Sequence, residues 1–238
     1  TVVAMGTSLP EFSVSLFSLL LGSADMSAGN VVGSNIFNTL IIVGASSLLM
    51  TIPVERSTTS RELPLCLLAT LALCACGVVG EVSRCSALLL LGLFCLFMAY
   101  SVRLGLRQKS EAARGGASSV WRTLLLLVAG VAALVIGGQT LVNSSADVAR
   151  WLGVSEAVIG LPILAGGTSL PELATSLVAA RKGSSGLALG NVVGSNIFNS
   201  TFVLGVCGIV RPLGLAGLAD VDWWALVVSL VLLWLFSV

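Results

Sequence analysis

One stretch of this sequence occurs twice. Residues 6–38 read GTSLPEFSVSLFSLLLGSADMSAGNVVGSNIFN, and residues 167–199 read GTSLPELATSLVAARKGSSGLALGNVVGSNIFN. The two copies align without a gap and are identical in the segments GTSLPE and GNVVGSNIFN. Self-similarity of this kind is the signature of an internal duplication. Any fold that this chain adopts must therefore contain two copies of one structural unit.

The composition indicates that this unit lies in a membrane. Of the 238 residues, 56% are apolar and only 10% are charged, whereas a soluble domain carries about 25% charged residues. Continuous apolar runs cover residues 63–79, 87–102, 123–141 and 223–238. A helix of about 20 such residues crosses a bilayer, and a transmembrane barrel would instead alternate apolar and polar residues. The sequence therefore predicts an all-α, multi-pass membrane protein.

The apolar runs also predict the relative direction of the two copies. We expect about eight transmembrane helices, near residues 1–22, 28–50, 63–80, 84–103, 122–144, 155–181, 188–210 and 221–238. The first copy occupies spans one and two, and the second occupies spans six and seven. Five crossings separate equivalent segments, and five is odd, so the copies must have opposite orientations. Inverted repeats with a substrate site at their interface are typical of secondary transporters.

Basic residues support this span count. Cytoplasmic loops of membrane proteins are rich in Lys and Arg. Alternate loops of this chain carry nine basic residues: Arg56, Arg61, Arg103, Arg107, Lys109, Arg114, Arg122, Arg181 and Lys182. The loops on the other side carry three, which are Arg84, Arg150 and Arg211. The bias places the loop between spans four and five in the cytoplasm.

That polar, Gly- and Ser-containing loop divides the chain into two regions. We expect a first membrane region over residues 1–102 with its repeat at 6–45, a cytoplasmic linker at 103–121, and a second region over 122–238 with its repeat at 167–206. Thr1 begins inside a predicted helix and Val238 ends inside an apolar run. We therefore expect the chain to be a fragment that lacks membrane segments at its ends.

Two acidic residues lie inside predicted spans. Glu11 and Glu172 occupy the same point of the two repeats, and a carboxylate at the centre of a membrane helix costs about 2.5–3.5 kcal/mol on insertion scales. A protonated carboxyl or a buried salt bridge would be a structural explanation, but the apolar spans of the repeats contain no Lys or Arg to form the bridge. We therefore favour a cation site that both carboxylates share.

Neighbouring residues supply further oxygen atoms. Pro10 and Pro171 cannot return a backbone N–H to the preceding turn, and a carbonyl freed in this way needs a partner inside a membrane. Hydroxyl and amide groups recur beside these prolines and along one face of the following span, at Thr7, Ser8, Asn30, Ser34, Asn38, Thr168, Ser169, Asn191, Ser195 and Asn199. Oxygen ligands suit hard cations such as calcium and sodium.

Other kinds of site have weaker support. The chain has no histidine, the commonest general base and metal ligand, and its cysteines fit the role of small apolar core residues. The net charge of +1 gives no reason to expect a nucleic-acid partner. Besides a secondary transporter, the residues leave open a cation channel lined by polar side chains and, with less support, an intramembrane hydrolase.

The paired segments GTSLPE and GNVVGSNIFN resemble the α-repeats of the sodium/calcium exchangers, in the calcium/cation antiporter superfamily. The resemblance implies an inverted-repeat antiporter fold of about ten spans, of which this chain would hold spans two to nine. It implies calcium binding by Glu11 and Glu172 with the carbonyl groups of Thr7 and Thr168. It also implies a set of sodium ligands: Ser8, Ser169, Ser34, Ser195, Asn38, Asn199 and the backbone at Ala4 and Ala165.

The expected function is therefore exchange of calcium for sodium by alternating access. Two ionised glutamates would be neutralised by one Ca²⁺ or two Na⁺. A calcium/proton exchanger of the same superfamily is the alternative within the resemblance. Many family members carry Asp where this chain has Asn199, and the change argues against potassium transport. We expect no cofactor and no enzymatic activity, calcium and sodium ions and the lipid bilayer as partners, and a site that one chain completes.

Overall fold

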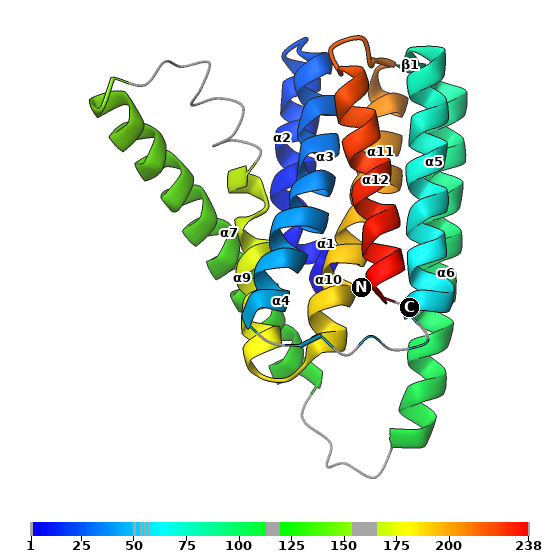
Figure 1. Ribbon diagram of the computed structural model, residues 1–238, viewed down its shortest axis with the longest axis vertical. Coiled ribbons are helices and arrows are strands. Elements are labelled where there is room, and N and C mark those ends of the chain that lie inside the picture. The colour runs from blue at the N-terminus through cyan, green and yellow to red at the C-terminus, as the bar shows by residue number, and fades with distance from the viewer. Residues whose placement is uncertain are drawn as a thin grey trace.

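The computed structural model is a bundle of helices that run along a common direction (Figure 1). It describes residues 2–49, 51, 52, 54, 56, 58–112, 120–153 and 166–237. The first half contains α1 (Val2–Thr7), α2 (Leu9–Leu20), α3 (Ala24–Phe37), η1 (Asn38–Ile42), α4 (Val43–Leu49), η2 (Thr58–Glu62), α5 (Leu63–Val79), β1 (Glu81–Val82) and α6 (Arg84–Ala112). The second contains α7 (Val120–Trp151), α9 (Leu170–Arg181), α10 (Ser185–Ile197), η3 (Phe198–Val203), α11 (Leu204–Val210), β2 (Leu213–Gly214) and α12 (Asp220–Ser237).

Five helical stretches among the described residues are long and apolar enough to cross a membrane. They are Ala24–Leu49, Thr58–Val79, Arg84–Gly105, Gly186–Val210 and Asp220–Ser237, and they match the predicted spans two, three, four, seven and eight. The first predicted span is divided between α1 and α2, and the fifth lies within α7. Helix α9 covers the second half of the sixth, whose residues 155–165 lie outside the described part of the chain.

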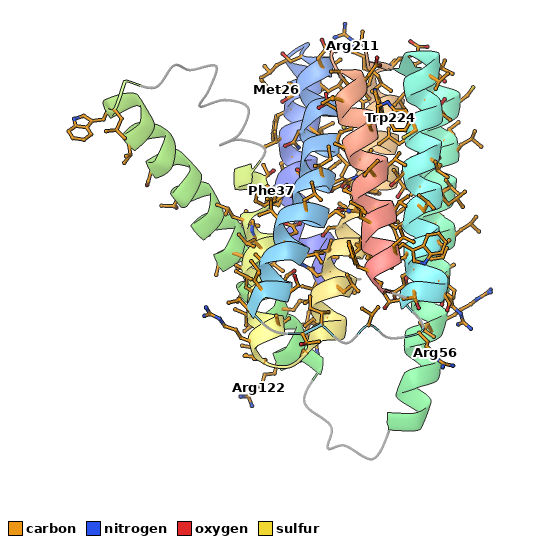
Figure 2. The ribbon with its side chains drawn as sticks, in the orientation of Figure 1. Met26, Phe37, Arg56, Arg122, Arg211 and Trp224 are labelled. Carbon is orange, nitrogen blue, oxygen red and sulfur yellow. The ribbon has the colours of Figure 1, made fainter. Side chains whose placement is uncertain are left out.

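Contacts between loops confirm the direction of the chain. Strands β1 and β2 pair antiparallel, with Glu81 opposite Gly214. The N–H of Gly217 donates to Asp25 Oδ1 at 3.2 Å. The loops that follow α2, α5 and α11 therefore meet at one end of the bundle, as the span count requires. Arg211 lies at this end, whereas Arg56 and Arg122 lie at the other end (Figure 2), in agreement with the predicted loop charges.

A short interruption divides the first helix of each repeat. Helix α1 ends at Thr7 and α2 begins at Leu9, and the intervening Ser8 has φ −87° and ψ 9°. Ser169, before α9, has φ −88° and ψ 6°. A proline stands in the first turn of both following helices, where its missing N–H costs no hydrogen bond. The prolines therefore break the helices beside the glutamates, as predicted.

Close helix packing supports the bundle around these breaks. Gly208 of α11 lies so near α6 that a Cβ atom added there would stand 2.8 Å from Ala87 Cβ. The rings of Phe12, Phe94, Phe198 and Phe202 form a contiguous cluster between α2, α6 and η3. Helix α7 packs on α1 and α9 and leans away from the bundle at its other end (Figure 1).

Helix α6 continues to Ala112 and so includes part of the stretch that the sequence predicts as a linker. Residues 113–119 of that stretch lie outside the described part of the chain.

Candidate cation site

The two glutamates of the repeats are buried at the centre of the bundle. Glu11 in α2 and Glu172 in α9 are both 0% exposed. Ser169 Oγ donates to Glu11 Oε1 at 2.9 Å, and Ser8 Oγ donates to Glu172 Oε1 at 2.7 Å. Each glutamate is therefore held by the serine of the other repeat, and the two helix breaks face one another.

Each of these carboxyl groups keeps one oxygen atom free. Oε2 of Glu11 and Oε2 of Glu172 are buried and have no hydrogen-bond partner within the described residues. No ion pair to either glutamate is present in that same part of the chain. An ionised carboxylate that is buried without a compensating charge is strongly unfavourable, so each of these carboxyl groups must either hold a proton or face a bound cation.

Two asparagines brace the segments that carry the glutamates. Asn30 Nδ2 donates to the carbonyl of Glu11 at 3.2 Å and to Ser15 Oγ at 3.0 Å. Asn191 Nδ2 makes the equivalent contacts in the second repeat, at 3.5 Å and 3.2 Å. The side-chain oxygen of Asn191 has no partner among the described residues, whereas Asn30 Oδ1 accepts from Thr168 Oγ1 at 3.5 Å.

Most of the other predicted ligands are also buried here. Thr7 and Ser195 both donate to the carbonyl of Ala4, at 3.2 Å and 3.4 Å, and Ser195 Oγ also lies 3.4 Å from Glu172 Oε1. Ser34 is fully buried, and its hydroxyl has no partner in the described part of the chain. The prediction for Ala165 falls on a residue outside the described ranges.

Asn38 and Asn199 belong to a second network that the sequence reasoning did not identify. Its six buried side chains are Asn35, Asn38, Thr39, Asn196, Asn199 and Ser200, which we call the asparagine clasp. Asn38 Nδ2 donates to Asn196 Oδ1 at 3.1 Å, and Asn199 Nδ2 donates to Asn35 Oδ1 at 3.3 Å. The clasp joins the second helix of one repeat to that of the other.

The sequence did contain a signal for this network. Asn35 and Asn196 are identical in the two copies and lie four residues before Thr39 and Ser200, so each pair shares a helix face. The stripe predicted from the sequence instead runs through Asn30, Ser34 and Asn38. Asn35 lies one residue away from that stripe, and the π-helical turn begins only at Asn38.

The donor atoms of this site are all oxygens. Carboxylate, hydroxyl, amide and carbonyl oxygens are the ligands that Ca²⁺ prefers, whereas Zn²⁺ and copper select nitrogen and sulfur. No group of three or more His, Cys, Asp or Glu side chains that could hold a metal is found among the described residues. Two carboxylates surrounded by neutral oxygens therefore form a site suited to hard cations.

Comparisons with known proteins agree with this chemistry. The sequence model of a family described as "Sodium/calcium exchanger protein" matches residues 1–103 and 122–238. The chain is 41% identical to the "Putative antiporter CaxA" of Alkalimonas amylolytica over 89% of its own length and 69% of that protein. It is 30% identical to the "Sodium/calcium exchanger MaX1" of Methanosarcina acetivorans over 91% of its length and 73% of that protein.

Solved structures give the same result. The sodium-calcium exchanger NCX_Mj, soaked with 2.5 mM Na⁺ and 0.1 mM Ca²⁺, superimposes with a TM-score of 0.84 at 32% identity. The match covers 100% of this chain and 76% of that one. The fold predicted from the inverted repeat is thereby confirmed.

Proposed function

Because the chain belongs to the sodium/calcium exchanger family, we propose that it exchanges calcium for sodium across a membrane by alternating access. Members of this family are antiporters, and the activity they share is the transport of a cation in exchange for a counter-ion. The observation that carries the proposal is the pair of buried glutamates, each held by a serine of the other repeat and each with a free oxygen.

Calcium binds, in this proposal, between the free oxygens of Glu11 and Glu172. The carbonyl groups of Thr7 and Thr168 complete the calcium ligands from the two helix breaks. Sodium ions use the remaining oxygens, which are those of Ser8, Ser169, Ser34, Ser195, Asn38 and Asn199 and the backbone at Ala4 and Ala165. The burial of these groups and the absence of a protein cation beside the carboxylates, within the described residues, support this assignment.

The charge of the site explains why transport would be an exchange. Two ionised glutamates carry −2, which one Ca²⁺ or two Na⁺ neutralise. Two like charges about 5 Å apart repel by about 3 kcal/mol at an effective dielectric constant of about 20. An empty ionised site therefore resists enclosure, and binding of either set of ions removes the repulsion. A protein that changes its accessibility only when loaded exchanges ions and does not leak them.

Sodium coupling is supported by the neutral ligands. Hydroxyl and amide oxygens outnumber the two carboxylates, and such oxygens can coordinate Na⁺ but cannot release a proton near neutral pH. The relative from Methanosarcina acetivorans is named as a sodium/calcium exchanger. Asn199 contributes a neutral amide where many family members have a carboxylate, and we propose that exchange does not require potassium.

The proposal is tested by calcium-45 uptake into sodium-loaded proteoliposomes that contain the purified protein. Uptake is measured with and without an outward sodium gradient, for the native protein and for Glu11→Gln and Glu172→Gln. These variants keep the size of the side chain and remove one charge. Glu81→Gln is the matched control, because Glu81 is an exposed acid in the loop at β1.

Calcium uptake that requires the sodium gradient and is lost in both buried variants, but not in the control, is the expected result. Uptake that ignores sodium and follows a pH gradient would assign proton coupling instead. Uptake that survives both buried substitutions would show that the carboxylates are not the cation site.

A further inference from the structure

The hydrogen bonds of the asparagine clasp determine which way two amide groups face. An asparagine amide has an acceptor oxygen at one side and a donor NH₂ group at the other. Only the oxygen can bind a cation. Asn38 and Asn199 therefore serve as ligands only if something holds their oxygens toward the ion.

The orientation of Asn196 is fixed by atoms that can only accept. Its Nδ2 lies 3.4 Å from the backbone carbonyl of Asn35 and 2.8 Å from Thr39 Oγ1. Thr39 donates its own hydrogen to that same carbonyl at 2.9 Å, so its hydroxyl has only a lone pair left for Asn196. A reversed amide would place its oxygen against that carbonyl, and Thr39 could donate to it only by giving up its own bond to the carbonyl. Oδ1 of Asn196 must therefore face Asn38.

Asn196 in turn fixes Asn38. The oxygen of Asn196 accepts from Asn38 Nδ2 at 3.1 Å, which turns the oxygen of Asn38 to the opposite side. That oxygen is buried and has no partner among the described residues. An unpaired buried acceptor is unfavourable, so the clasp holds an oxygen that needs a partner at a point where the described residues supply no donor.

A similar set of contacts surrounds Asn199. Asn35 Nδ2 donates to Ser200 Oγ at 2.8 Å and lies 3.5 Å from the carbonyl of Asn196. Its oxygen accepts from Asn199 Nδ2, and the oxygen of Asn199 is again buried without a partner in the described ranges. The equivalent oxygen atom of each repeat is thus left without a partner among the described residues.

We propose that Asn35 and Asn196 are positioning residues, which hold the amide oxygens of Asn199 and Asn38 toward the transported cation. They touch no ion themselves and act through the asparagines that they orient. The inference rests on the proposed function, because it assumes that a cation passes these oxygens. It adds that a neutral hydrogen-bond network, and not the carboxylates alone, sets the affinity of the site.

A double-mutant cycle separates this role from a general loss of stability. Asn196→Ala removes the acceptor for Asn38 and should raise the sodium concentration for half-maximal calcium exchange about fivefold, since one oriented polar contact contributes about 1 kcal/mol. Asn38→Ala should raise it by a similar factor. The double variant should show no more than the larger single effect, because Asn196 acts only through Asn38.

A second pair of variants distinguishes a positioning role from a loss of correct folding. Thr39→Val keeps the shape of the side chain and removes the hydroxyl that accepts from Asn196. Thr39→Ser keeps the hydroxyl and reproduces the residue that the second repeat carries as Ser200. We expect Thr39→Val to raise the sodium concentration for half-maximal calcium exchange, whereas Thr39→Ser should keep that concentration near the native value. A purely structural role would lower the maximal rate and the yield of both without moving that concentration.

The results of these variants can be told apart from the results that test sodium coupling. If native uptake proves indifferent to sodium, the proposed counter-ion is wrong, and the clasp is then assessed by the calcium concentration for half-maximal uptake in the same variants. Additive effects of Asn196→Ala and Asn38→Ala, or variants in which only the maximal rate changes, would overturn the positioning role.

Discussion

Replacing Asn199 by Asp should make the stability of the protein depend on bound cations. In the native chain Asn199 Nδ2 donates to Asn35 Oδ1 at 3.3 Å. An aspartate would place a carboxylate oxygen against that acceptor, and it would add a third acidic group to a region that already contains two fully buried glutamates. The substitution therefore loses a hydrogen bond and introduces a charge that no described side chain compensates.

The size of the effect follows from these two losses. Leaving an uncompensated buried charge typically costs about 3–5 kcal/mol, and in a domain of this length each kcal/mol lowers the melting temperature by about 2–4 °C. We expect Asn199→Asp to melt about 6–20 °C below the native protein in cation-free buffer. Calcium stabilises the folded state in proportion to the logarithm of its concentration over its dissociation constant. A third carboxylate lowers that constant, so at one calcium concentration the variant should gain about 1.4 kcal/mol more than the native protein for each tenfold increase in affinity.

The assay is thermal unfolding of the purified protein in detergent, followed by the fluorescence of its five tryptophans. Melting is recorded in choline buffer, then with sodium and with calcium. Asn199→Leu is the control: it loses the same hydrogen bond without adding charge, so cations should stabilise it no more than the native protein. An Asn199→Asp variant that melts with the native protein in choline, or that gains nothing extra from calcium, would refute the reasoning.

Three further predictions follow from contacts described above. Ser8→Ala and Ser169→Ala each remove a hydrogen bond to a carboxyl group, which contributes about 1.5–3 kcal/mol. Both variants should slow calcium uptake into vesicles at least tenfold. Ser13→Ala, on the exposed side of α2, is the control and should leave uptake unchanged. Gly208→Ala should destabilise the fold by about 1–3 kcal/mol through overpacking. Ala87→Gly should restore only part of the melting temperature, because the added Cβ would still lie 2.9 Å from Val82 Cγ1. In a cysteine-free background, Glu81→Cys with Gly214→Cys should form a disulfide on mild oxidation, because opposite residues of an antiparallel pair lie close enough for a disulfide. If no cross-linked product appears on an SDS gel, the two loops are not paired in this way.

Much of the fold could be predicted because the sequence contains two copies of one segment, which can be compared with each other. The duplication around Glu11 and Glu172 gives two aligned copies, and counting apolar runs between them gives the inversion without any alignment to other proteins. The pairing of β1 with β2 could not be predicted in this way. It joins two loops that are far apart in the sequence, and a two-residue strand has no periodicity to detect.

The candidate site was predictable residue by residue but not contact by contact. Intramembrane carboxylates are costly, so their positions marked Glu11 and Glu172, whereas the resemblance to the exchanger repeats selected Ser8 and Ser169 as ligands. The sequence could not indicate that Ser8 reaches across to Glu172 and not to Glu11, because that depends on how the two breaks face one another. Asn35 was missed because it lies one residue away from the i, i+4 stripe through Asn30, Ser34 and Asn38 that was used to select ligands.

The crossed bonds between serines and glutamates bear on how such a chain arose. Since each glutamate is held by the serine of the other copy, a single copy has no complete site. Separate chains of one copy each could complete the site only as a pair inserted in opposite directions, which requires loops with no bias in basic residues. A chain that contains both copies is free of that requirement. It can carry nine basic residues in the loops predicted on one side and three in those on the other, and its two copies can differ, as Thr39 and Ser200 do.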